Sequence, residues 1–228
     1  MLMAEAAAAF MVLSLGVAAF QDIRGRVIND LTWFIAAPGV ALAIWTAAKS
    51  PPIVIYLYVL DAAIGIALAA IIWVTKSMGE ADAIGIALIS TSTVPALPPT
   101  PLYAALNSPV IASLINSMLL TTPFIIWNIA MNTVRAGKCL EMSGASALRR
   151  LAYLLFLTCE RSSVVRRKPW AYSPGRLSLR ISDEAAQASE GREYVLVSYN
   201  MPYIAYMFLG YVIYLLIGDL VLKLIVIA

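Results

Sequence analysis

Long apolar stretches separated by short polar segments make up most of the chain. A helix needs about 20 apolar residues to cross the hydrocarbon core of a bilayer, because each residue advances it by about 1.5 Å. Five stretches reach or approach this length: Met1–Phe20, Leu31–Ala48, Ile53–Val74, Val110–Met131 and Tyr203–Ala228. A sixth stretch, Ala83–Leu97, is shorter, rich in Ser and Thr, and closed by prolines.

The placement of positive charge favours six spans over five. With six, all but two of the 16 Lys and Arg residues lie on one side of the membrane, and the exceptions are Lys49 and Lys223. If Ala83–Leu97, the fourth stretch along the chain, did not span, Arg24 and Arg26 would lie on the opposite side of the membrane from the large basic segment. The positive charge would then no longer be concentrated on one side. Cytoplasmic loops carry the excess of positive charge. We therefore expect both termini outside, the basic segment in the cytoplasm, and a first span that is retained, since no basic region precedes it.

A polar insert, residues 132–200, separates the fifth span from the sixth. Alternation of period two at Leu177–Ile181 and Tyr194–Tyr199 predicts β-strands, with Asp183–Arg192 as an exposed connector. The apolar run Leu151–Thr158 is too short to span and is expected on the membrane surface or against the insert. Both cysteines lie in the insert, where a cytoplasmic location argues against a disulfide.

These patterns predict an all-α integral membrane protein. We expect a bundle of six transmembrane helices with a small cytoplasmic α+β insert between helices 5 and 6. Residues 1–131 would hold helices 1 to 5, residues 132–200 the insert, and residues 201–228 the last helix.

The composition of the chain excludes several kinds of catalytic, metal-binding and nucleotide-binding site. Some 61% of the 228 residues are hydrophobic and 13% are charged, whereas soluble domains carry about 25% charge. The chain has no histidine, which excludes a Ser-His-Asp triad, a Cys-His pair and a histidine-ligated metal. Its two cysteines are too far apart for a CxxC metal or redox motif, and no Walker or GxGxxG motif suggests nucleotide binding. Neither a cofactor nor a metal is predicted, and nucleic-acid binding is not expected.

Carboxylates inside a bilayer are costly and are therefore candidates for function. On the predicted topology, Asp22 ends the first helix and Asp82 begins the fourth, both at the cytoplasmic boundary. Asp61 would lie near the middle of the membrane, and Asp219 toward the outer leaflet. Only Asp22 and Asp82 share a depth, as paired-carboxylate chemistry around one water requires.

The segments around this pair carry a resemblance to a known family. Asp22 lies in the motif Q-D-x-R-x-R-x-x-x-D, residues 21–30, with Trp33 after it, and Asp82 lies in G-E-A-D, residues 79–82. These motifs resemble those of the archaeal prepilin and preflagellin (archaellin) peptidases, a group of GxGD-type intramembrane aspartyl proteases. The second motif departs from GxGD, because Ala81 stands at the third position. The family's bacterial relatives also methylate their product and carry a cysteine-rich segment, which this chain lacks.

The resemblance implies an aspartyl endopeptidase that removes the leader from prepilin-like and preflagellin-like precursors, without methyltransferase activity. Asp22 and Asp82 would activate water, and Gly79, Glu80, Arg24 and Arg26 would support the loops or the substrate. Simpler interpretations exist. Asp22 could pair with Arg24 or Arg26 at the interface, and Asp82 could be a helix N-cap. Asp30 is expected to cap the second span.

Two other classes of function compete with a peptidase. Asp61 and Asp219 could form the proton relay of a small ion-coupled carrier. Alternatively, the chain could be a non-enzymatic scaffold of a secretion system that docks through its insert. The carrier hypothesis lacks a detectable internal repeat, and the scaffold hypothesis gives no reason for two aspartate motifs at one depth.

Overall fold

A computed structural model describes residues 2–96, 108–135, 138–139, 151, 153–155, 157–167, 172–174 and 193–227. The described chain is mostly helical, with a small β-sheet, and it divides into two compact units. The first unit contains residues 1–120 and 202–228, and the second contains residues 121–201.

Four helical segments of the described chain are long and apolar enough to cross a membrane, which indicates a multi-pass membrane protein. They are α1 (Leu2–Gly25), the 3₁₀ helix η1 (Asp30–Ala36) continued by α2 (Ala37–Ala48), α3 (Pro52–Thr75), and α6 (Pro109–Arg135). Each matches one of the predicted spans. The other helices of the first unit are shorter: α4 (Glu80–Ser92), α10 (Tyr203–Ile217) and α11 (Leu220–Ile227).

Two of the predicted spans differ from the structure. Helix α4 has 13 residues and is therefore about 20 Å long, too short to cross the apolar core alone. The predicted last span, Tyr203–Ala228, is not one helix, because it breaks at Gly218 between α10 and α11. Gly218 has φ 93° and ψ −154°, a conformation open essentially to glycine alone. An apolar run predicts helix throughout, but this one glycine ends it.

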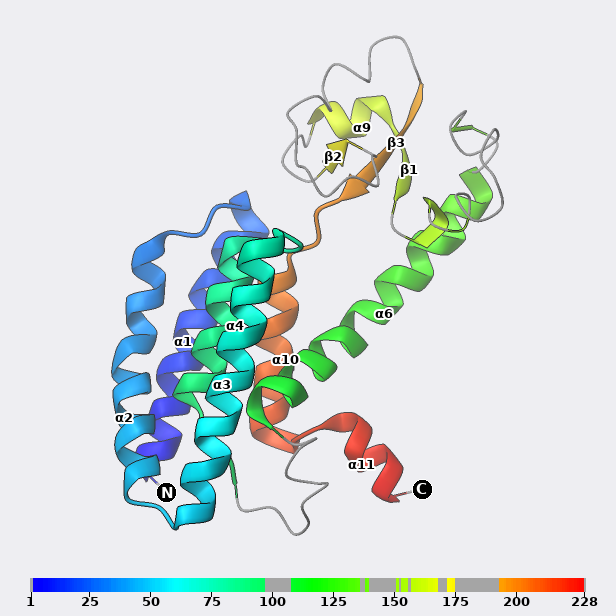
Figure 1. The fold of residues 1–228 in the computed structure, drawn as a ribbon. Helices are drawn as coiled ribbons and strands as arrows, with labels where there is room; N and C mark the ends of the chain where they lie inside the picture. The colour runs from blue at the N-terminus through cyan, green and yellow to red at the C-terminus, as the bar shows by residue number, and fades with distance from the viewer. Residues whose placement is uncertain are drawn as a thin grey trace. The chain divides into compact units, whose positions relative to one another are not determined.

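Helix α1 is the centre of the first unit, where it contacts η1, α2, α4 and α10. Figure 1 shows α1 and α3 running in one direction and α2, α4 and α10 in the other. The main core packs Met11 and Leu15 of α1 against Ile86 of α4 and Met207 of α10. Close approach depends on small residues, since a Cβ at Gly65 would lie 2.1 Å from Ser90 Oγ.

A buried asparagine on α6 holds the broken last helix in place. The Nδ2 of Asn116 donates to the carbonyl oxygens of Gly210 (3.4 Å) and Gly218 (3.1 Å), and its Oδ1 accepts from the N–H of Leu220 (3.1 Å). The side chain is fully buried. One amide therefore satisfies backbone groups on both sides of the break, which lipid could not satisfy.

The second unit contains a three-stranded antiparallel sheet in the order β1-β3-β2. Its strands are β1 (Thr158–Arg161), β2 (Tyr172–Pro174) and β3 (Tyr194–Tyr199), and the short helix α9 (Ser162–Arg167) follows β1. The predicted strand at Tyr194–Tyr199 is confirmed. The predicted strand Leu177–Ile181 and the connector Asp183–Arg192 lie outside the described residues.

Both faces of β3 are covered, although a strand with period-two alternation is usually covered on one face. Tyr194 and Leu196 pack with Leu157 on one face, and Val195 and Val197 pack with Val165 on the other. The alternation therefore separates two small apolar clusters rather than a wet face from a dry one. The run Leu151–Thr158 was expected on the membrane surface or against the insert, and its described residues take the second position. Leu157 lies in the cluster with Tyr194 and Leu196, Tyr153 and Leu154 pack against that cluster, and the run leads into β1.

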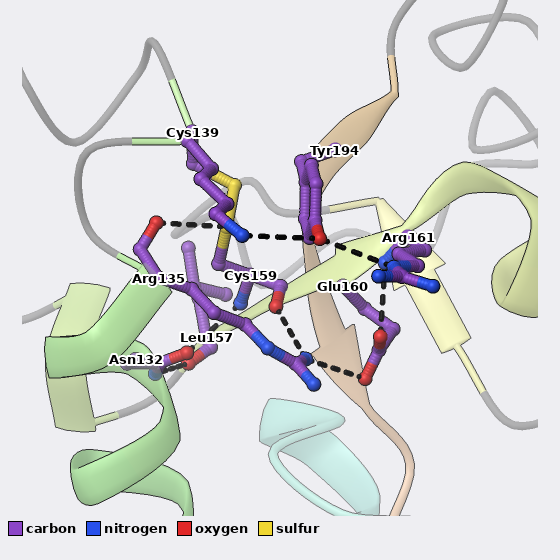
Figure 2. The surroundings of a disulfide bond; sticks show 9 residues. Asn132, Arg135, Cys139, Leu157, Cys159, Glu160, Arg161 and Tyr194 are labelled. Carbon is purple, nitrogen blue, oxygen red and sulfur yellow. Dashed lines mark hydrogen bonds and ion pairs between the residues drawn. A yellow bond between two sulfur atoms is a disulfide. The ribbon is translucent and has the colours of Figure 1, made fainter.

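The expectation that the cysteines stay unpaired was wrong, because Cys139 and Cys159 form a disulfide. Figure 2 shows how the end of α6 meets β1. Asn132 Oδ1 accepts from the N–H of Cys159 (2.9 Å), and Arg135 Nη1 contacts Glu160 Oε2 (3.0 Å). These contacts bring the segment after α6 beside β1, with a Cα–Cα distance of 6.2 Å between the cysteines. The spacing of the two cysteines along the sequence does not predict that these segments meet.

Next to the disulfide, a tyrosine lies between two cations. Arg161 Nε donates to the hydroxyl of Tyr194 (3.1 Å), and Lys138 Nζ lies 5.0 Å from the centre of its ring. The hydrogen bond from Arg161 lowers the pKa of Tyr194, because a cationic donor favours the phenolate.

Replacing Asn116 with leucine should lower the free energy of unfolding by about 2 kcal/mol, because it leaves buried backbone groups without partners. Thermal unfolding of the purified chain in detergent would measure the effect. The matched control on the same helix is Leu119→Ala, at a partly exposed apolar position. Equal stability of Asn116→Leu and wild type would contradict the role assigned to this amide.

Candidate active site at one end of the bundle

Asp22 lies in the last turn of α1, where its side chain is 13% exposed. The guanidinium of Arg26 reaches back to it, with Nη1 3.6 Å from Oδ1. The backbone N–H of Ile204, in the first turn of α10, lies near enough to act on this carboxyl. The carboxyl therefore has a cation from its own loop and faces the start of another helix.

Asp82 lies in the first turn of α4. Its Oδ2 accepts from the backbone N–H of Gly79 at 3.0 Å, the reach-back contact of the third helical position. Gly79 itself is the N-cap, so the interpretation of Asp82 as the N-cap was wrong by three positions. Ala81 is helical, and Gly79 has φ −65°. Alanine at the third motif position therefore meets no conformational obstacle.

The two carboxyls lie close enough to interact electrostatically. Figure 1 shows why: the end of α1, the start of α4 and the start of α10 lie at the same end of the first unit. The phenol of Tyr203, at the start of α10, also interacts with Asp82. Three helix ends thus place two acids, one guanidinium and one phenol together.

The loop after α1 is organised by Gln21, the residue before the first aspartate. Its Oε1 accepts from the N–H of Asn29 (2.8 Å) and from Oγ1 of Thr32 (3.2 Å). The loop thereby folds back on α1 next to Asp22. Asn29, rather than the predicted Asp30, caps η1 by accepting from the N–H of Leu31 (2.9 Å). Asparagine does this equally well, so the sequence could not separate the two neighbours.

Of the four residues predicted to support the aspartates, two contact them and two have other partners. Arg26 contacts Asp22, and Gly79 contacts Asp82. The guanidinium of Arg24 instead lies 4.8 Å from the centre of the Phe20 ring. Glu80 pairs with Lys76 at 2.6 Å on the exposed surface, as expected for a solvated carboxylate.

Sequence reasoning missed Gln21, Tyr203 and Ile204 as parts of the site. Gln21 stands in the quoted motif, but nothing in the motif says which backbone groups it binds. A signal for the other two is Pro202, since a proline before an apolar run predicts a helix start. Which helix start meets the aspartates is a property of the packing.

The rival carboxylates, Asp61 and Asp219, bind the starts of two helices. Asp61 accepts from Ser108 Oγ and from the N–H of Val110 at the start of α6. Asp219 accepts from the N–H of Leu222 (3.0 Å) in the first turn of α11. Both are 2% exposed. Asp61 Oδ2 is buried and has no hydrogen-bond partner within the described chain.

Comparison with known proteins does not identify the chain. No protein-family model matches its sequence, and no curated protein matches it. Within the described residues, no group of three or more His, Cys, Asp or Glu side chains could hold a metal ion.

Replacing Asp219 with alanine should lower the free energy of unfolding by about 1 kcal/mol, because the first turn of α11 loses its cap. Asp219→Asn is the matched variant, since asparagine keeps a side-chain oxygen at the same place. Thermal unfolding in detergent should rank Asp219→Asn close to wild type and Asp219→Ala below both. The same loss in both variants would show that the charge, and not the cap, matters.

Proposed function

We propose that this protein is an intramembrane aspartyl endopeptidase in which Asp22 and Asp82 activate the water that cleaves a peptide bond. One observation carries the proposal: two acids from motifs 60 residues apart, on different helices, lie at the same end of the bundle, near enough for the charge of Asp22 to act on Asp82. Neighbouring carboxyls are costly to keep ionised together, so such a pair shares one proton. That arrangement supplies a base and an acid without histidine or metal.

The substrate class follows from the resemblance to prepilin and preflagellin peptidases. A dyad at the membrane edge suits a precursor whose polar leader joins an apolar helix, since the bond to be cut then lies at that edge. Prepilin-like and preflagellin-like precursors have this organisation, and the surrounding lipid would hold their apolar helices beside the enzyme.

Six crossings remain part of the proposal despite the short α4. Residues 93–96, directly after α4, are not helical, yet Thr93 is 5% exposed. Thr93 Oγ1 bonds to the hydroxyl of Tyr211 at 2.8 Å. Non-helical backbone is tolerated at membrane depth where protein surrounds it. Helix α4 and this segment could thus complete a crossing that α4 cannot make alone.

The disulfide bears on the proposed cytoplasmic location of the insert and the dyad. Disulfides persist mainly in oxidising compartments, but intracellular proteins of hyperthermophilic archaea are rich in them. The archaeal resemblance and the excess of positive charge both favour the cytoplasmic side. The disulfide fits that side if the cytoplasm belongs to such an organism.

Cleavage of a membrane-anchored prepilin-like reporter tests the function. Asp22→Asn and Asp82→Asn should each lower the rate about 100-fold or more, because each removes a proton-transfer group. Asp219→Asn is the matched control, a buried carboxyl replaced by its isostere outside the dyad, and it should retain cleavage. Cleavage that survives in either dyad variant would overturn the assignment.

A carrier is tested by the cleavage assay together with a transport assay. Asp61 Oδ2, buried without a partner in the described chain, is the observation that favours a proton-carrying role for this residue. If wild type does not cleave the reporter and Asp61→Asn abolishes proton-coupled uptake into vesicles, the carrier replaces the peptidase.

The proposed sidedness predicts which lysines an impermeant amine reagent reaches in intact cells. Lys49 and Lys138 are both exposed, but only Lys49 should be labelled, because Lys138 belongs to the cytoplasmic insert. Both should react after permeabilisation, as mass spectrometry of the purified chain would show. Labelling of Lys138 in intact cells would place the insert outside.

A further inference from the structure

The surroundings of the two aspartates are unequal. The carboxyl of Asp22 has the guanidinium of Arg26 at 3.6 Å. Asp82 has one backbone N–H, from Gly79, and its charged neighbour is the carboxyl of Asp22. The guanidinium of Arg26 favours the ionised form of Asp22, whereas none of the ion pairs within the described residues gives Asp82 a cation.

We propose that Arg26 is a positioning residue that keeps Asp22 ionised as the general base, so that the shared proton rests on Asp82, the general acid. This inference rests on the proposed peptidase function. It assigns separate roles to two acids that the motifs alone leave interchangeable.

The backbone of Arg26 ends α1 and is compatible with this contact. Arg26 has φ 58°, the left-handed conformation that non-glycine residues rarely adopt. Its N–H donates to the carbonyl oxygen of Asp22 at 3.1 Å, which closes the end of α1 and turns the Arg26 side chain back toward the last turn. The side chain is 15% exposed, so water screens the pair only in part.

Other charged groups nearby leave the asymmetry intact. Arg24 lies against the ring of Phe20, and Glu80 is paired with Lys76. From α10, the phenol of Tyr203 interacts with Asp82, and a neutral phenol adds no charge. Arg26 is therefore the cation that distinguishes the two acids.

The roles define a balanced reaction. Asp22 takes a proton from water while the water oxygen bonds to the scissile carbonyl carbon, and Asp82 gives its proton to the carbonyl oxygen. Asp22 then donates its proton to the amide nitrogen as the carbon–nitrogen bond breaks. Asp82 recovers a proton from a hydroxyl of the intermediate as the carboxyl product forms. One water is consumed, and both aspartates return to their starting states.

The pH dependence of reporter cleavage by the full chain tests the role of Arg26. The base must be ionised, so activity falls on the acidic side as Asp22 takes up a proton. Without its cation, Asp22 takes up that proton at higher pH. Arg26→Gln should therefore move the acidic limb of kcat/KM upward by about one pH unit, and Arg26→Lys should move it back. Arg24→Gln removes the same charge nearby and should leave the limb in place.

The outcomes separate this inference from the function on which it rests. If wild type does not cleave the reporter, the peptidase proposal fails. Suppose instead that cleavage needs both aspartates, but the acidic limb of kcat/KM does not move in Arg26→Gln, or moves equally in Arg24→Gln. The peptidase proposal is then retained and the role of Arg26 is refuted.

A second measurement does not depend on the folding of Arg26 variants. Infrared spectra of wild type and Asp82→Asn near neutral pH compare the carbonyl band of protonated carboxyl groups. The band should lose intensity in Asp82→Asn, because that residue holds the proton. An unchanged band would place the proton elsewhere and overturn the assignment.

Discussion

Polar groups in the first unit have to find their partners within the protein, because the lipid around an apolar bundle offers none. This constraint accounts for its buried polar side chains. Asn116 bonds three backbone groups around the break in the last helix. Asp61 and Asp219 bind the starts of α6 and α11. Helix ends are where backbone donors are left over, so the buried acids gather there.

The acids of the candidate active site also lie at helix ends, but they differ from the other buried acids in lying near each other. At these helix ends, Asp82 accepts from the N–H of Gly79 and Asp22 pairs with Arg26. Unlike Asp61 and Asp219, they come within electrostatic range of each other. An acid that only caps a helix gains nothing from a second acid beside it. This proximity is unfavourable for two ionised carboxyls, and the proposed function in proton transfer depends on it.

The second unit is held by different means. Asn128 and Asn132 on α6 bond the backbone and side chains around Leu157–Cys159, and the disulfide adds a covalent link at the same place. A sheet of three short strands buries little apolar surface, so cross-links contribute a larger share of its stability. The disulfide lies in the insert, and the insert and the dyad are proposed to share one side of the membrane. The compartment in which the disulfide persists is therefore also the compartment proposed for the dyad.

The sequence alone determined the long helices, strand β3 and the two aspartates as candidates. Each depends on local information: the length of an apolar run, an alternation of period two, or the rarity of charge in such a chain. Tertiary structure decided the length of α4, the break at Gly218, the disulfide, and which of Arg24 and Arg26 meets Asp22. These depend on contacts between segments far apart in the chain or on the rotation of one side chain about a helix end. A linear pattern records where a charge or a glycine stands, but packing decides which neighbour it meets.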